Sequence, residues 1–176
     1  MTRTATKRRS APVSAPRTQV RATSLPSARP GAGKPDPVME FLRLIWALDH
    51  NLHVSSKRMA TVHGVTGPQR LVVRLVGQHP NISGGELARV LHVHKSTITG
   101  IVQRLEARGL VRRETDATDA RRIRLTLSAS GRRMAGPLAG TTEAAVRRVL
   151  AGTDARSIEA TRRVLERLAQ ELAGGK

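Results

Sequence analysis

One stretch limits the fold of this chain more than any other: VHKSTITGIVQRLEARGLVRRETDATDARRIRLTLS, residues 93–128. At 100° per residue, its first half is an amphipathic helix with four apolar side chains on one arc: Ile98, Ile101, Val102 and Leu105. The opposite arc is small and polar, with Ser96, Gly100, Gln103 and Ala107 flanked by Thr99 and Arg104. A solvated helix face usually carries many Glu and Lys residues, so this face favours close approach to another surface.

The second half of the stretch predicts a β-hairpin. Gly109 ends the helix, and residues 110–114 can form one strand. After a turn at residues 115–120, three apolar residues alternate with polar ones, as in a half-buried strand: Ile123, Leu125 and Leu127. The connection is strongly charged, with Asp116, Asp119, Arg121 and Arg122. The sequence therefore predicts a protruding basic tip next to the amphipathic helix.

Helices precede and follow this stretch. Residues 38–59 repeat apolar residues at three- and four-residue steps, which predicts a long helix. Two capping boxes, Thr66 with Gln69 and Ser83 with Glu86, open two shorter helices. The second of these is expected to turn three residues inward: Leu87, Val90 and Leu91.

The last third of the chain predicts two more helices. Ser128 can cap the first, which we expect to run through Gly131, Met134, Leu138, Val146 and Leu150. Thr153 or Asp154 can cap the second, whose apolar stripe is Ile158, Leu165, Leu168 and Leu172. The short middle segment cannot cover these stripes as well as the long first helix. We therefore expect the terminal helices to join a second copy in a two-fold dimer.

Charge points to a polyanionic partner. The chain carries +18 over 176 residues, and the presence of one Trp, one Phe and no Tyr leaves few aromatic side chains for stacking single-stranded bases. Duplex DNA is thus favoured over RNA. The chain has no Cys, no transmembrane-length apolar run and no signal-peptide pattern, so we expect a cytoplasmic, nucleoid-associated protein that does not bind membranes.

Residues 1–37 are expected to be a disordered basic tail. They are rich in Pro, Ser, Thr, Ala and Arg, lack hydrophobic periodicity and carry +7. Such a tail is either a solubilising leader or an arm that lies along DNA. The remaining residues, 38–176, carry +11. Binding to DNA is therefore expected of the folded part itself.

The motifs and their order resemble the MarR family of winged helix-turn-helix regulators. The matching segments are Thr66-x-x-Gln69, Glu86-Leu-Ala88, Lys95-Ser-Thr-Ile-Thr99, Arg104-Leu-Glu106, Arg108-Gly-Leu-Val111, Asp119-Ala-Arg121-Arg122, Leu125-Thr-Leu127 and Gly131. The resemblance covers roughly residues 38–173. It implies a mainly α (α+β) fold, with a winged helix-turn-helix at 66–127 and dimerisation helices at 38–65 and 128–173. Three residues depart from the family pattern: His94, Gly100 and Gln103.

The resemblance also implies a function. It predicts a sequence-specific, ligand-responsive repressor that binds duplex DNA as a homodimer on a pseudo-palindromic operator. Major-groove contacts are expected from Ser96, Thr97, Thr99 and Gln103, with Gly100 allowing close approach and Lys95 and Arg104 nearer the phosphates. Asp119 is expected to hold Arg121 toward the minor groove, with Arg122 beside it. An architectural protein that binds any duplex is the alternative, because high positive charge alone attracts DNA.

Other site types are weakly supported. The sequence holds no enzymatic constellation, so we expect no catalysis and no cofactor. A small aromatic or anionic effector could be lined by Trp46, His50, His53 and Arg70, although a lone Trp is more often part of a core. The pairs His50/His53 and His92/His94 lack a supporting carboxylate or Cys, so we predict no metal site.

Overall fold

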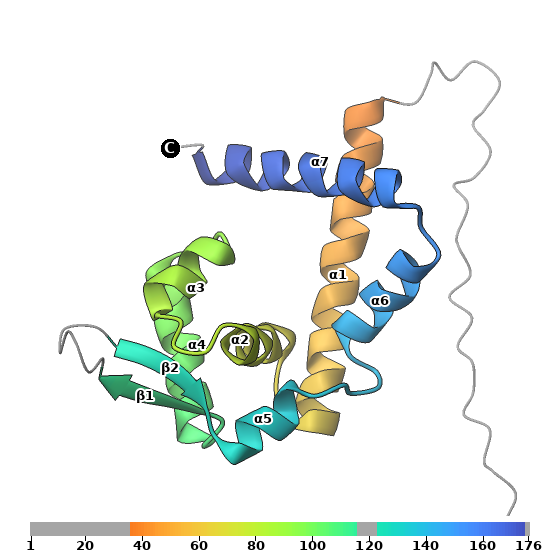
Figure 1. The fold of residues 1–176 in the computed structure, drawn as a ribbon. Coiled ribbons are helices and arrows are strands. Elements are labelled where there is room, and N and C mark those ends of the chain that lie inside the picture. The colour runs from red at the N-terminus through yellow and green to blue at the C-terminus, as the bar shows by residue number, and fades with distance from the viewer. Residues whose placement is uncertain (1–35, 116–122, 175–176) are drawn as a thin grey trace, which may run out of the picture. The chain divides into compact units, whose positions relative to one another are not determined.

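A computed structural model describes residues 36–115 and 123–174 of the chain. These residues form seven α-helices and two β-strands: α1 (Pro37–His63), α2 (Gly67–Gln78), α3 (Gly84–Val90), α4 (Lys95–Ala107), β1 (Val111–Thr115), β2 (Ile123–Leu127), α5 (Ala129–Ala135), α6 (Thr142–Ala151) and α7 (Ala155–Gly174) (Figure 1). The predicted mainly helical fold with a two-stranded wing is confirmed. The basic tail predicted at residues 1–37 lies almost entirely outside the described residues.

Both predicted capping boxes are present. At the start of α2, the Thr66 side chain accepts from the backbone N–H of Gln69, whose side chain accepts from the backbone N–H of Thr66. Ser83 and Glu86 make the same reciprocal pair at the start of α3. Each box satisfies two backbone donors that a helix start would otherwise leave unpaired, and so fixes where the helix begins.

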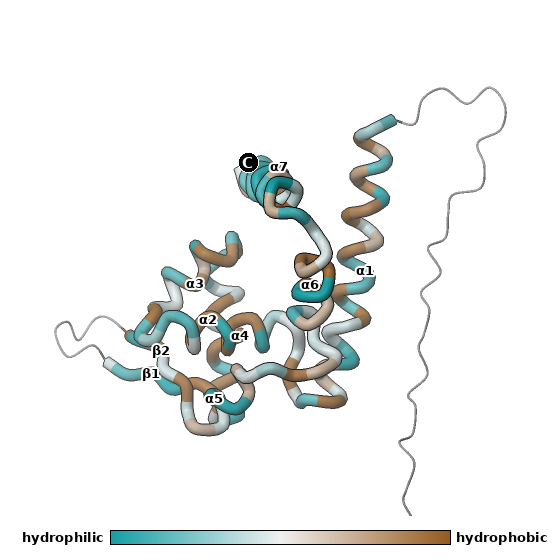
Figure 2. The backbone as a smooth tube through the Cα atoms, turned by 45° about the vertical axis from the view of Figure 1, so that its right-hand side comes forward, coloured by the Kyte–Doolittle hydropathy of each residue, from teal (hydrophilic) through white to brown (hydrophobic). Residues whose placement is uncertain are grey.

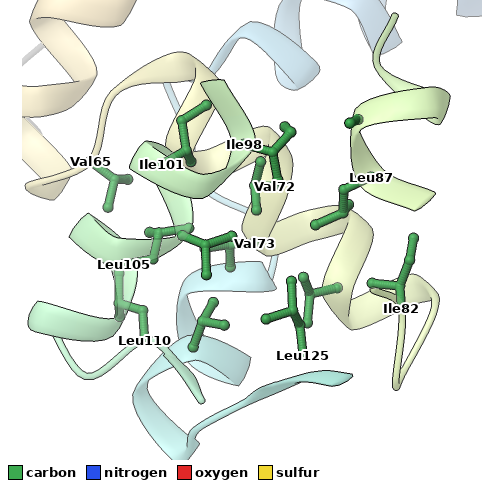
Figure 3. Packing of buried hydrophobic residues seen from close by; sticks show 14 residues of the cluster. Val65, Val72, Val73, Ile82, Leu87, Ile98, Ile101, Leu105, Leu110 and Leu125 are labelled. Carbon is green, nitrogen blue, oxygen red and sulfur yellow. The ribbon is translucent and has the colours of Figure 1, made fainter. Parts of the chain in front are cut away.

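The core lies among α2, α3, α4 and the hairpin. Val72 and Val73 of α2, Leu87 of α3 and Leu105 of α4 have no exposed surface, and Leu125 of β2 is almost fully buried. Figure 3 shows these side chains converging on one another. All four residues predicted for the inner arc of α4 are buried here. Burying such side chains stabilises the fold by about 1.5–3 kcal/mol each.

The hairpin is antiparallel, and its register pairs Val111 with Leu127 and Thr115 with Ile123. The middle of β2 is anchored, because the backbone N–H of Leu125 donates to Ile82 O over 3.0 Å and the N–H of Asn81 donates to Leu125 O over 3.2 Å. The exposed fraction is high at the end where Thr115 pairs with Ile123, and Ile123 is 47% exposed. The expected burial of Ile123 is therefore wrong.

Two other expectations about burial and helix length are also wrong. Val90 is 54% exposed, and Ala88 takes its place in the core, because α3 is short and turns Leu87 and Ala88 inward. The helix predicted from Ser128 through Leu150 is broken into α5 and α6. Gly136 and Pro137 cause this break, since proline disfavours helical backbone at the residue before it and lacks an N–H donor.

The terminal helices leave much apolar surface uncovered. In α1 only Met59 is buried, and α6 and α7 bury no residue. Figure 2 shows hydrophobic segments recurring along α1 and on α6. Among the described residues, none of the helices has the length and apolar character needed to cross a membrane.

Candidate nucleic-acid interface

Helix α4 presents a free polar face. The side chains of Ser96, Thr97, Thr99 and Gln103 are exposed, whereas the apolar side chains on the opposite arc fill the core. This arrangement matches the amphipathic pattern in the sequence. It leaves short hydroxyls and one carboxamide available to another molecule, without the cost of displacing core contacts.

His94 fixes the first turn of this helix. It is the N-cap residue, with extended backbone angles, and its Nδ1 accepts from the backbone N–H of Ser96 over 3.3 Å. The same Nδ1 lies 2.7 Å from the Ser96 hydroxyl oxygen. An imidazole thus takes the place of the Ser, Thr, Asp or Asn side chain that usually caps a helix.

Gly100 lies within the polar face, between Ser96 and Arg104. A Cβ built there would have the Arg104 guanidinium as its nearest described neighbour, at 3.5 Å, which is an ordinary and flexible contact. Alanine would therefore fit at this position within the described subunit. A glycine requirement would have to come from a molecule that approaches α4 from outside.

Cationic side chains are exposed on α4 and on the neighbouring strand β1. Lys95 and Arg104 of α4 and Arg112 of β1 are exposed. Arg113 of β1 instead forms an ion pair with Glu106 of α4, with Nε 2.8 Å from Oε2, and this pair ties the hairpin to the helix. The hairpin and α4 are in contact through β1 (Figure 1). The hairpin thus has a fixed direction relative to the polar face.

The predicted wing residues Asp119, Arg121 and Arg122 lie outside the described residues. The strands do define where the connection between them starts and ends: it joins Thr115 to Ile123, the pair at the exposed end of the hairpin. The expected Asp119–Arg121 pair stays a prediction.

A groove of about 630 Å³ opens between α3, α4 and the hairpin. Its lining includes Arg89, Lys95, Thr99, Arg113 and Arg124, and also Glu86. Hydrogen bonds from the backbone N–H and hydroxyl of Ser83 hold the pKa of Glu86 below its ordinary value. A concave surface with this excess of cations suits a small anion or a phosphate group.

The four residues predicted to line an effector site differ in their surroundings. Trp46 is 78% exposed, so its assignment to the core is wrong for the single chain. His50 and His53 are also exposed on α1, and His53 Nδ1 lies 2.9 Å from the carbonyl oxygen of Asp49. Arg70 is only 2% exposed and is held by contacts within the chain rather than by solvent. Within the described residues, no three His, Asp or Glu side chains gather to hold a metal ion.

Arg70 joins α2 to the segment 134–143. Its guanidinium donates to the carbonyl oxygens of Met134 and Gly136, and its Nε lies 2.6 Å from Glu143 Oε1. This last contact is an ion pair rather than a hydrogen bond, because the N–H direction does not meet hydrogen-bond geometry. Arg74 donates to Ala135 O over 2.6 Å and lies 3.9 Å from the same carboxylate. We call Arg70, Arg74 and Glu143 the α2–α6 clamp.

The clamp was not predicted from the sequence. Its one signal was the position of Arg70, three residues before buried Val73 on the inner face of α2. A charged side chain on a buried face requires a partner of opposite charge. Glu143 is 73 positions away in the sequence, so nothing local identified it as that partner.

Comparisons with known proteins agree with this geometry. The model of the MarR family matches residues 63–122. The HTH-type transcriptional repressor Rv2887 of Mycobacterium tuberculosis is 32% identical over 108 residues, which cover 61% of this chain and 78% of the relative. The span matched by the family model includes the capped helices, α4 and β1.

Solved structures share the fold over a longer span. Staphylococcus aureus MepR in complex with DNA superposes with a TM-score of 0.63 at 17% identity, covering 75% of this chain and 97% of MepR. PcaV of Streptomyces coelicolor in complex with its natural ligand gives a TM-score of 0.62 at 23% identity, covering 79% and 98%. The chain belongs to the MarR family of winged helix-turn-helix transcriptional regulators, which are not enzymes.

Proposed function

We propose that this chain is a repressor that binds a specific duplex-DNA sequence as a homodimer, on the nucleoid in the cytoplasm. The main support for this proposal is the polar face of α4, which is exposed, low in charge and held in place by a buried opposite face. Helices that read base edges in the major groove use exposed polar side chains, among them Gln for adenine and Ser or Thr for several bases. The DNA-bound MepR with the same fold supports this proposal.

Within this face, each side chain is given a role by its chemistry. Gln103 offers both a donor and an acceptor, which suits the paired acceptor and donor on the adenine edge. Ser96, Thr97 and Thr99 reach other base edges, and Gly100 lets the helix backbone approach. Lys95 and Arg104 lie at the sides of the face, where phosphates run.

We propose that the wing enters the adjacent minor groove. Asp119 would orient Arg121, and Arg122 would add a phosphate contact. The exposed end of the hairpin, at Thr115 and Ile123, supports this placement, since the charged connection starts there. The guanidinium of Arg121 would then contribute to affinity on every duplex, with some preference for a narrow minor groove.

The homodimer is proposed from the uncovered apolar surface of the terminal helices. Val38, Phe41 and Leu42 in α1 and Leu165 and Leu172 in α7 each keep half or more of their surface exposed in one chain. Several large apolar side chains exposed along the same helices are typical of an interaction surface. Two copies related by a two-fold axis would place two α4 helices about one DNA turn apart, roughly 34 Å, and would require a pseudo-palindromic operator.

We further propose that a small aromatic or anionic molecule relieves repression, as the ligand-bound PcaV suggests. Trp46, His50 and His53 lie on one exposed face of α1 at helical spacing. Arg70 is less suited to this role, because Glu143 already neutralises its buried charge. The cationic groove beside α4 is a second place for an anion, and occupancy there would compete with DNA at Lys95 and Thr99.

The alternative function is an architectural protein that coats any duplex, which the charge of +18 favours. A competition assay separates the two functions. Labelled DNA from the region upstream of the protein's own coding sequence is bound by the full chain at moderate salt and challenged with unlabelled DNA. If the chain is a sequence-specific regulator, unlabelled upstream fragment should compete far better than unlabelled random duplex. Equal competition by the two would show architectural binding.

Two variants sharpen this test. Arg121→Ala should weaken binding to all duplexes and lower the slope of log K against log salt by about one. Gln103→Ala should instead change the ranking among operator variants. If both variants lose affinity equally on every sequence, base reading by α4 is wrong.

A further inference from the structure

We propose that His94 is a specificity-determining residue. It fixes the hydroxyl proton of Ser96, so that Ser96 meets the DNA as a hydrogen-bond acceptor and selects a base with an exocyclic amino group, adenine or cytosine. The inference rests on the proposed function, since it names the base chemistry that α4 reads. It follows from two distances at the start of the helix.

The first distance assigns the tautomer of His94. The backbone N–H of Ser96 lies 3.3 Å from Nδ1, and an amide N–H can only donate. We therefore assign Nδ1 as the unprotonated nitrogen and place the ring proton on Nε2; the single lone pair of Nδ1 is then shared by the amide N–H at 3.3 Å and the closer Ser96 hydroxyl at 2.7 Å. The ring is thereby set as an acceptor at Nδ1 and a donor at Nε2.

The second distance assigns the hydroxyl of Ser96. Its Oγ lies 2.7 Å from the same Nδ1, which is a short hydrogen bond. Because Nδ1 has no proton, the hydroxyl must be the donor. A serine hydroxyl has one proton and two lone pairs, so only its lone pairs remain for another molecule. Ser96 is exposed, and these lone pairs are accessible.

The Thr99 hydroxyl, one turn further along the helix, also has its proton engaged within the protein. It donates to the carbonyl oxygen of Lys95 over 3.0 Å. Both hydroxyls at the start of the polar face therefore have their protons engaged within the helix. Thr99 shows a common helical bond, whereas the His94–Ser96 bond depends on the residue before the helix.

This polarity has a direct meaning in the major groove. Adenine presents an amino group at N6 and cytosine one at N4, and both are donors. Guanine and thymine present acceptors at O6, N7 and O4, apart from the thymine methyl group. An acceptor-only Ser96 matches the first pair and opposes the second. A free serine hydroxyl would accept either kind of base by rotating.

Capping alone does not account for a histidine at this position. Ser, Thr, Asp and Asn are the preferred N-cap residues, and each would satisfy the Ser96 N–H. A side chain whose acceptor also holds the Ser96 hydroxyl adds a property beyond helix stability. Asparagine can imitate it, because its Oδ1 occupies nearly the same place as Nδ1 of histidine. Alanine cannot.

The test selects binding sites from a randomised duplex library. Four full-length proteins are used: the natural chain, Ser96→Ala, His94→Ala and His94→Asn. The position read by Ser96 is the one whose preference disappears in Ser96→Ala. We expect adenine or cytosine there with the natural chain and with His94→Asn. With His94→Ala, guanine or thymine should be accepted as well.

A base analogue then isolates the amino group. At that position, adenine is replaced by purine, or cytosine by its counterpart without the amino group. The natural chain should lose about tenfold in affinity, the value of one hydrogen bond. Ser96→Ala should bind the duplex with the natural base and the duplex with the analogue about equally well, because this variant lacks the hydroxyl that contacts the amino group. The loss of affinity caused by the analogue is compared between the two proteins. Any effect of the analogue on base pairing is the same for both and cancels in this comparison.

Three results would overturn the inference. Guanine or thymine at the Ser96 position of the natural chain would contradict the assigned polarity. A uniform loss of affinity in His94→Ala, with unchanged base preference, would make His94 a cap and nothing more. A library that yields no enriched sequence with the natural chain would overturn the proposed function itself, and this inference with it. Thermal unfolding of each variant identifies any loss that comes from misfolding.

Discussion

The helix-turn-helix body, residues 66–127, and the terminal helices α1, α6 and α7 use similar apolar residues in very different ways. In the body, Val72, Leu87 and Leu105 are fully buried within one chain. In α6 and α7 no residue is buried, and Leu172 is 75% exposed. The body therefore has its partners inside the chain, whereas the terminal helices leave their apolar side chains exposed in one chain, as the proposed dimer requires. The α2–α6 clamp connects the two regions.

The largest expected effect contrasts a leucine in each region. Leu105→Ala should lower the free energy of unfolding by about 2–5 kcal/mol, because it leaves a cavity in a closed core. Leu165→Ala in α7 should cost about 1 kcal/mol or less in protein dilute enough to separate the proposed dimer. Urea denaturation at two protein concentrations measures both. Equal losses in dilute protein would show that α7 is already packed within one chain.

A glycine pair tests how closely α5 packs against the body. A Cβ at Gly131 in α5 would collide with the carbonyl oxygen of Leu110, so Gly131→Ala should cost about 3 kcal/mol. Gly85→Ala in α3 is the control, since its Cβ would meet only the Ser83 hydroxyl, at 3.9 Å. Chemical denaturation should leave the control as stable as the natural chain. A tolerated alanine at 131 would mean that α5 can move away from the Leu110 carbonyl.

The clamp is expected to matter less than the core. Glu143→Gln leaves the buried Arg70 charge without its counterion and should cost about 2 kcal/mol, below the usual range because Glu143 is partly exposed. Glu159→Gln is the control, because its ion pair with Arg162 in α7 is on the surface. Thermal unfolding should separate the two variants. If they behave alike, Arg70 is held by its backbone contacts alone.

The smallest effect is a pH dependence of the clamp. Burial alone would raise the pKa of Glu143, but hydrogen bonds from its own N–H and from Thr141, together with Arg70, lower it below 4.5. A lowered pKa gives stability that is present above the unfolded value and is lost on acidification. The stability difference between the natural chain and Glu143→Gln should therefore narrow as the pH falls below 4.5. A constant difference would contradict the ion pair.

The same contrast explains how much of the structure the sequence predicted. Local signals identified the capping boxes at Thr66 and Ser83, the buried arc of α4 and the hairpin, because each depends on neighbours a few residues away. The break at Pro137 also had a local signal, but the apolar periodicity on both sides concealed it.

Other features had no local signal. The pairing of Arg70 with Glu143 depends on the fold as a whole. The exposure of Trp46 could not be judged from helical spacing, because spacing shows that a stripe exists and not which molecule covers it. For the candidate site, the sequence indicated which face of α4 is free. The hydroxyl polarity at Ser96 required the position of the His94 ring.

The central claim is that two copies read two half-sites through α4. The most direct measurement is sedimentation of the full chain on the duplex selected from the library, combined with a footprint of the same complex. We predict two chains on each duplex and two protected segments related by symmetry, centred about one helical turn apart. One chain per duplex with a single protected segment, or equal protection of unrelated duplexes, would contradict the claim.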